Sequence, residues 1–151
     1  MSRKPSPSRR RSAARLAAVQ ALYQRQMEST PLARLLDEFH QHRLGQEIED
    51  EQYIRAEVAF FDDVVSGVIA REEEIDALLA ERLTNDWRLD RLDKTLLQIL
   101  RAGTYELLAR PEIPAGSTIS EYLDVAHAFF DKGDTRIING VLDAVAKSVR
   151  A

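Results

Sequence analysis

The chain has 151 residues, of which 44% are hydrophobic and 30% charged, a balance typical of one folded domain rather than of a disordered or fibrous protein. It contains no cysteine, which excludes disulfides, thiolate zinc sites and thiol nucleophiles. No apolar run reaches the length of a membrane span, and none follows the basic start as in a secretory signal, so we expect a cytoplasmic protein with no membrane partner.

The net charge of −4 is unevenly distributed along the chain. The segment before Glu28 carries seven basic residues and no acidic residue, whereas the rest carries 14 basic and 25 acidic residues. An acidic body with a basic arm is typical of proteins in which one end meets a polyanion.

The first half of the chain predicts a short tail followed by helices. Residues 1–8 contain two prolines and three serines and predict a disordered basic tail. Apolar residues then recur at helical spacing from about Arg9 to Glu28, which predicts a first helix whose stripe includes Tyr23 and Met27. Thr30-Pro31 predicts a cap and first turn for a second helix, with Leu32, Leu35, Leu36 and Phe39 on one face and Gly45 after its end.

The middle of the chain predicts three more helices. A long apolar face begins near Asp50 and reaches about Ala70, and a shorter stripe from Ile75 to Leu83 forms a fourth helix, separate from the third or continuous with it. Residues 84–86 predict a break. Trp87 and Leu89 lead into a fifth helix carrying Leu92 and later leucines, which Pro111 and Pro114 end.

The last third predicts two helices. Thr118-Ile-Ser-Glu121 matches a capping box, and the apolar stripe behind it reaches Phe129 and Phe130. Asp134 or Thr135 can cap a final helix, whose core stripe is Ile138, Val141, Leu142, Val145 and Val149. No segment alternates as a strand does. The sequence therefore predicts an all-α, compact single domain of six to seven helices over residues 9–151.

Side chains suited to catalysis or metal binding are few. His40 and His42 are two positions apart, which on a helix directs the rings to different faces, and no third ligand is evident. His127 with Asp124 favours a surface ion pair, and the acidic groups 62–63, 90–93 and 72–74 are interpreted as solvated faces. Neither glycine-rich nucleotide motif occurs. We expect no enzyme activity, no catalytic residue, no metal and no cofactor.

The arginine run at the start is the one segment with specific chemistry. Arg11 and Arg15 are four residues apart and are predicted to project side by side, with Arg9 and Arg10 extending the stripe. Guanidinium groups fork onto phosphate oxygens and stack on exposed bases, which suits single-stranded RNA. The alternative is a solvated tail, or a non-specific contact with any polyanion.

Asn139-Gly140 would suggest a hairpin turn in another context. Here the pair lies inside the helical stripe of the last helix. We therefore favour a packing role for Gly140, in which the missing side chain lets a neighbouring helix approach and offsets the poor helix propensity of glycine.

Four motifs occur in order along nearly the whole chain. They are Arg9-Arg-Arg-x-Ala-x-Arg15, Ala18-Val-Gln-Ala-Leu-Tyr23, Ile99-Leu-Arg-Ala102 with Tyr105-Glu-Leu107, and Ile138-Asn-Gly-Val-Leu-Asp143. Together they resemble the NusB family of transcription antitermination factors. The resemblance implies an all-helical fold without catalysis.

The resemblance also implies partners and site residues. Proteins of this family bind boxA RNA together with NusE, a small-subunit ribosomal protein, and help RNA polymerase to pass terminators in ribosomal RNA operons. Carried over, the RNA-binding residues are Arg9, Arg10, Arg11, Arg15, Gln20, Lys132 and Arg136, and the NusE-binding residues are Tyr23 and Asp93. Ile137 stands where many relatives have an aromatic residue on which a base can stack.

Other interpretations stay open from the sequence alone. The chain could be a helical protein-interaction module whose basic arm meets RNA incidentally. It could also be related to the NusB-like domain of some ribosomal RNA methyltransferases, although 151 residues leave no room for the catalytic domain. Its apolar stripes could bury a homodimer interface, and self-association over the RNA site would then be an off-state.

Overall fold

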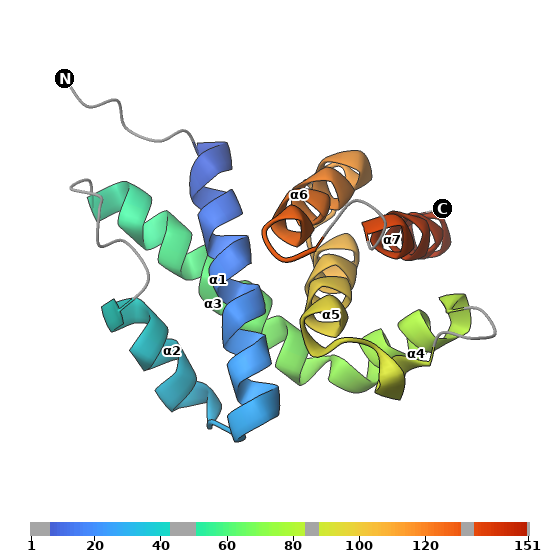
Figure 1. The fold of residues 1–151 in the computed structure, drawn as a ribbon. Helices are drawn as coiled ribbons and strands as arrows, with labels where there is room; N and C mark the ends of the chain where they lie inside the picture. Colours follow the sequence, from blue (N-terminus) through green and yellow to red (C-terminus); the bar gives the residue numbers. More distant parts are fainter. Residues whose placement is uncertain (1–6, 43–50, 84–87, 131–134, 151) are drawn as a thin grey trace. The chain divides into compact units, whose positions relative to one another are not determined.

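The computed structural model describes residues 7–42, 51–83, 88–130 and 135–150, which form seven α-helices, one 3-10 helix and no strand (Figure 1). The elements are α1 (Pro7–Glu28), α2 (Leu32–His42), α3 (Glu51–Ala70), α4 (Glu72–Arg82), η1 (Leu89–Arg91), α5 (Lys94–Ala109), α6 (Ala115–His127) and α7 (Thr135–Val149). The prediction of an all-α fold is confirmed. None of these helices combines the length and the apolar character needed to cross a bilayer.

Several predicted features lie outside the described residues. They are most of the predicted tail (residues 1–6), Gly45, the break at residues 84–86, Trp87, Lys132 and Asp134. The last two residues of the predicted tail belong to α1, which begins at Pro7 rather than near Arg9.

The chain divides into two compact units, Met1–Ser66 and Gly67–Ala151. The first contains α1, α2 and most of α3, and the second contains the last turn of α3 and the remaining helices.

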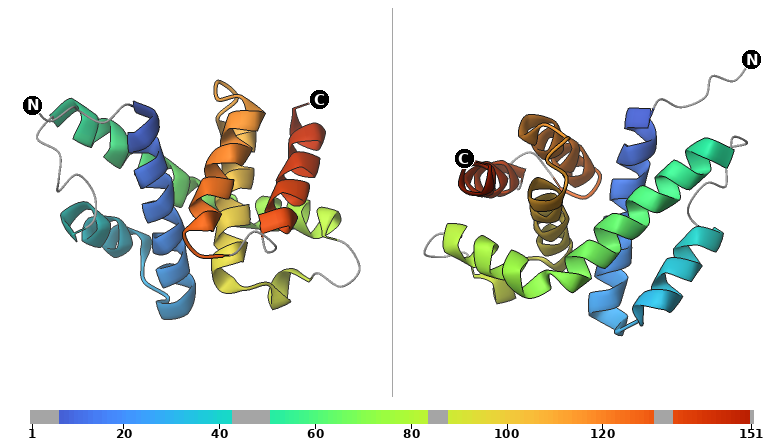
Figure 2. Two further views of the ribbon diagram at one scale, coloured as in Figure 1. Left: turned by 45° about the horizontal axis from the view of Figure 1, so that its top comes forward. Right: turned by 180° about the vertical axis from the view of Figure 1, so that it is seen from behind.

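In the first unit, α2 returns alongside α1 (Figures 1 and 2). The reversal follows Ser29, whose φ of 55° is left-handed and whose N–H donates to the carbonyl of Arg25 at 2.8 Å, a common way to end a helix. Leu32 begins α2, and the carbonyl of the preceding Pro31 accepts from the Leu35 N–H. The Gln24 amide donates to Glu38 at 2.9 Å and links the two helices.

Aromatic contacts connect α2 with α3 inside the first unit. The rings of Phe39 and Phe61 stack with centroids 5.5 Å apart. Beside them, His40 Nε2 lies 2.5 Å from Asp62 Oδ1. His40 therefore has a carboxylate partner, and Asp62 is not simply part of a solvated face as the sequence suggested.

In the second unit, α5 packs against α4, α6 and α7 (Figure 2). Every residue from Leu96 to Leu107 is buried, as expected of a helix covered on several sides. The helix begins later than predicted, because Leu89–Arg91 form η1 and Leu92 is extended. Asp93 is the N-cap of α5, where its carboxylate accepts from the N–H groups of Thr95 and Leu96 at 2.9 and 3.1 Å.

Glycine packing differs from the prediction. A Cβ at Gly140 would meet no described atom within 4 Å, and Gly140 is exposed on α7, so the predicted packing role is wrong. Close packing occurs at Gly103, where a Cβ would lie 2.9 Å from Leu142 Cδ1. It also occurs at Gly67, where a Cβ would lie 2.1 Å from Tyr105 Cζ.

The predicted capping box is also wrong. Pro114 is the N-cap of α6, so Thr118 lies within the helix and donates its N–H to the Pro114 carbonyl at 3.1 Å. The helix ends at His127, and Phe129 is exposed in the following turn rather than on a buried stripe. Thr135 is the first residue of α7 rather than the residue that caps it.

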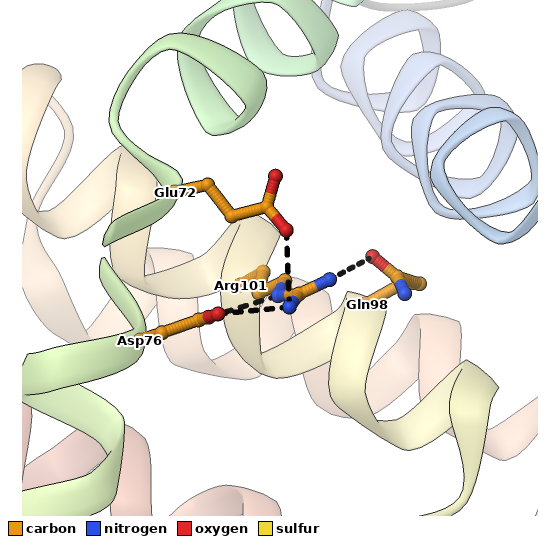
Figure 3. Close-up of polar contacts among 4 residues, drawn as sticks. All are labelled: Glu72, Asp76, Gln98 and Arg101. Carbon is orange, nitrogen blue, oxygen red and sulfur yellow. Dashed lines mark hydrogen bonds and ion pairs between the residues drawn. The ribbon is translucent and has the colours of Figure 1, made fainter. Parts of the chain in front are cut away.

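A charged network joins α4 to α5 (Figure 3). The Arg101 guanidinium makes two hydrogen bonds to Asp76, at 2.9 and 2.8 Å, and an ion pair with Glu72 at 3.2 Å. Bidentate pairing of this kind is among the stronger polar contacts in proteins. Glu72 therefore belongs to a partly buried network, and the prediction that residues 72–74 are a purely solvated face is wrong.

The C-terminal arginine supports the end of α5. The Arg150 guanidinium donates to the carbonyls of Leu107, Ile113 and Arg110 at 3.0, 2.6 and 2.9 Å. The last carbonyls of a helix have no partner within that helix. Arg150 supplies hydrogen-bond donors for these carbonyls and connects the loop before α6 to the end of α7.

Candidate nucleic-acid interface

The arginine run lies in the first turns of α1. Because the helix begins at Pro7, Arg9 lies in its first turn and Arg10 and Arg11 follow directly, close to the unpaired backbone N–H groups that give a helix its positive end. The first turn contains no acidic residue. Helix dipole and side-chain charge therefore have the same sign at this end of the chain, and both favour an anion.

Two arginines of the run meet a single aromatic ring. The guanidinium carbons of Arg11 and Arg15 lie 5.2 and 5.0 Å from the centroid of Phe60 on α3. Residues four apart share a face of a helix, which is why one ring reaches both. A cation over an aromatic face contributes about 0.5–1 kcal/mol when exposed and about 2 kcal/mol when desolvated.

Burial separates these two arginines. Arg15 is only 3% exposed, whereas Arg11 is half-buried. Both side chains reach the same ring of Phe60, whereas the sequence predicted that they project side by side into solvent. The guanidinium of Arg15 contacts Phe60 and is shielded from solvent, and its contact with RNA stays a prediction.

A second surface lies further along α1. Tyr23 and Met27 are 40% and 54% exposed, and Gln20 is half-exposed three residues before Tyr23. Exposed aromatic and methionine side chains are enriched in protein interfaces. The sequence placed both Tyr23 and Met27 on the apolar stripe of this helix, and their exposure shows that this was wrong. Their spacing of four residues was the available signal that the two share a face.

The remaining predicted residues lie in the second unit. Arg136 is exposed in the first turn of α7, where no residue is acidic, and Asn139 is exposed one turn later. Asp93 is exposed at the start of α5, but its carboxylate caps that helix. Ile137 is half-buried.

An open hollow of about 650 Å³ lies where α3 meets α4, lined by residues 69–74 and 76. Its surface is mainly acidic. Arg71 donates two hydrogen bonds to Glu74, at 2.9 and 2.8 Å, and these bonds lower the pKa of Glu74 and raise that of Arg71. Because this arginine is paired and its neighbours are carboxylates, the hollow repels a polyanion. Among the described residues no group of three or more His, Asp or Glu could hold a metal ion.

Comparisons with known proteins agree with this architecture. The sequence model of the NusB family matches residues 12–147. The transcription antitermination proteins NusB of Novosphingobium aromaticivorans and Sphingopyxis alaskensis are 66% and 60% identical over 140 residues, which cover 93% of this chain and 95% and 94% of those proteins.

Solved structures show the same fold. T. maritima NusB is 28% identical with a TM-score of 0.74, and the match covers 96% of this chain and 93% of that one. A crystal structure of the antitermination factors NusB and NusE in complex with double-stranded RNA is similar with 24% identity and a TM-score of 0.77, covering 93% and 98%.

Proposed function

The chain belongs to the NusB family of transcription antitermination factors, and from that premise we propose that it binds boxA-type single-stranded RNA as a heterodimer with NusE. NusB proteins are not enzymes, so the prediction of a non-catalytic protein is confirmed by family membership. In this proposal the heterodimer joins the antitermination complex of RNA polymerase in the cytoplasm and supports transcription of ribosomal RNA operons.

The observation that carries the proposal is the basic segment that precedes Glu28 and includes the start of α1. Seven basic residues and no acidic residue precede Glu28 in a chain that is otherwise acidic, and the first turn of the helix adds its own positive end. If four to six of these cations contact phosphates, log affinity falls against log salt with a slope of about −3 to −4, at about 0.7 per phosphate.

A second polypeptide explains how such an arm acquires selectivity. Contacts with phosphates carry no sequence information, so a basic arm alone binds RNA indiscriminately. A partner bound at Tyr23 and Met27, on the same helix as the arginines, would place a second RNA-binding surface next to the first and raise affinity through effective concentration. A related NusB has been crystallised with NusE and double-stranded RNA, which supports RNA binding by the two proteins together.

Three residues of the second unit are proposed as further contacts with the partners. Arg136 offers an exposed cation at the positive end of α7. Lys132, which precedes it in the sequence, is proposed as a second RNA-binding cation. Asp93 is proposed as a NusE contact, in which its carboxylate would accept a further hydrogen bond besides those that cap α5.

The exposed bases of single-stranded RNA suit stacked guanidinium groups better than a uniform duplex does.

A binding experiment with both partners tests the proposal. The chain, NusE and a labelled boxA oligonucleotide from the organism's own ribosomal RNA leader are combined and followed by size exclusion and fluorescence anisotropy. We expect a ternary complex that prefers boxA to a scrambled RNA. A stable complex with NusE that shows no such preference would instead support the second candidate, a protein-interaction module, which the exposed Tyr23 and Met27 favour.

A further inference from the structure

Phe60 is the point at which α3 meets the arginine run. Its ring is buried at 4% exposure, yet two guanidinium carbons lie within 5.2 Å of its centroid. Like charges four residues apart on a helix repel each other. The negative face of an aromatic ring attracts both cations and offsets that repulsion, so Phe60 holds both arginine side chains against α3.

A cation–π contact involves the charge of a guanidinium and does not require its N–H donors. The group is planar, and its five N–H donors point outward in that plane. Arg15 is buried, but Arg11 is half-exposed. A ring whose face attracts the Arg11 cation therefore restricts the side chain while its N–H groups can still donate to a phosphate. An arginine that is already ordered loses less rotamer freedom when it grips a phosphate.

We infer that Phe60 is a positioning residue for RNA binding, which acts by holding Arg11 in the orientation that meets a phosphate. The inference rests on the proposed function. It divides the arginine run into two classes. Arg15 is buried and connects α1 to α3 through Phe60. Arg11 contacts the same ring, and its N–H groups bind RNA.

Substitutions that keep or remove the ring test the inference. Phe60→Leu keeps an apolar side chain but removes the aromatic face. We expect it to weaken boxA binding by about threefold to tenfold and to make the salt slope shallower by about 0.7, the loss of one phosphate contact. Phe60→Tyr keeps the ring and is expected to retain both the affinity and the slope.

The neighbouring aromatic supplies a matched control. Phe61 is fully buried in the same helix and stacks on Phe39, so Phe61→Leu removes a comparable buried ring that packs on a phenylalanine. It is expected to lower stability while leaving the salt slope unchanged. In a variant that already carries Arg11→Gln, Phe60→Leu is expected to cause no further change in slope, because both substitutions remove the same contact.

A measurement on the unsubstituted chain covers the case in which Phe60→Leu does not fold. NMR relaxation of arginine Nε–Hε groups should show Arg11 more ordered than Arg34, whose side chain is 75% exposed. Equal mobility of the two, or a folded Phe60→Leu chain with the full salt slope, would overturn the inference and leave the proposed function standing. If the unsubstituted heterodimer shows no preference for boxA, both the inference and the proposed function are contradicted.

Discussion

The guanidinium carbon of Arg15 lies 5.0 Å from the centroid of the Phe60 ring, and almost none of Arg15 is exposed to solvent. An arginine run that looks uniform in the sequence therefore contains at least one cation that serves the interior of the first unit. Removing one partner of a buried charged contact is destabilising, so we expect this side chain to contribute to the stability of the fold.

Arg15→Ala is expected to lower the free energy of unfolding by about 2–4 kcal/mol, because it removes a buried charged group together with its contact to Phe60. Urea denaturation measures the change. Arg34→Ala, at an exposed position of α2, serves as the control and is expected to change stability by less than about 0.5 kcal/mol. Equal, small effects of both substitutions would contradict the structural role of Arg15.

Gly140→Ala is expected to raise the free energy of unfolding by about 0.5–1 kcal/mol, since alanine is the better helix former and the new Cβ meets open space among the described residues. Gly67→Ala is the matched opposite. Its Cβ would lie 2.1 Å from the Tyr105 ring, and we expect a loss of about 2 kcal/mol or more from overpacking. Thermal unfolding of both variants measures the two changes, and a destabilising Gly140→Ala would contradict the open environment.

Asp76→Ala is expected to lower the free energy of unfolding by about 2–3 kcal/mol, because the nearly buried Arg101 loses a bidentate partner and keeps the weaker contact with Glu72. Glu73→Ala, on the exposed side of the same turn, is the control and should stay within about 0.5 kcal/mol. Denaturation with guanidinium chloride measures the free energy of unfolding of both variants. If the two variants unfold at the same denaturant concentration, the network does not stabilise the contact between α4 and α5.

The Arg71–Glu74 pair predicts a pH dependence. The hydrogen bonds from Arg71 lower the pKa of Glu74, so the pair stabilises the folded state above the unfolded-state pKa of glutamate, about 4.3. That contribution is lost as the pH falls through the lower folded-state value. Arg71→Gln is expected to return the pKa of Glu74 towards its ordinary value in an NMR titration of the side-chain carboxyl. An unchanged titration would show that Arg71 is not the cause.

Periodicity predicted the helices well because burial of one face leaves a direct trace in the sequence. The stripes of α2, α3 and α7 lie on helices that the structure confirms. Boundaries were less predictable. Thr118 has the pattern of a capping box, but Pro114 already starts α6, and the choice between two nearby caps depends on the loop before the helix.

The position of the candidate site was predictable from the sequence. Which of its arginines contact Phe60 was not. Sequence placed the arginines on α1, and nothing local could show that Phe60, 45 residues after Arg15, would lie beneath two of them. The same limit applies to glycine. Gly103 and Gly140 are both helical glycines, and which one a neighbouring side chain approaches depends on tertiary packing.

A salt series on the heterodimer tests the central claim most directly. Affinity for boxA RNA is measured from low to near-cellular salt for the unsubstituted chain and for the Arg10→Ala, Arg11→Ala double variant. We predict a slope of about −3 to −4, shallower by about 1.4 in the variant, which loses two phosphate contacts, with NusE binding unchanged in both. An unaltered slope, or an equal loss of RNA and NusE binding, would contradict the account.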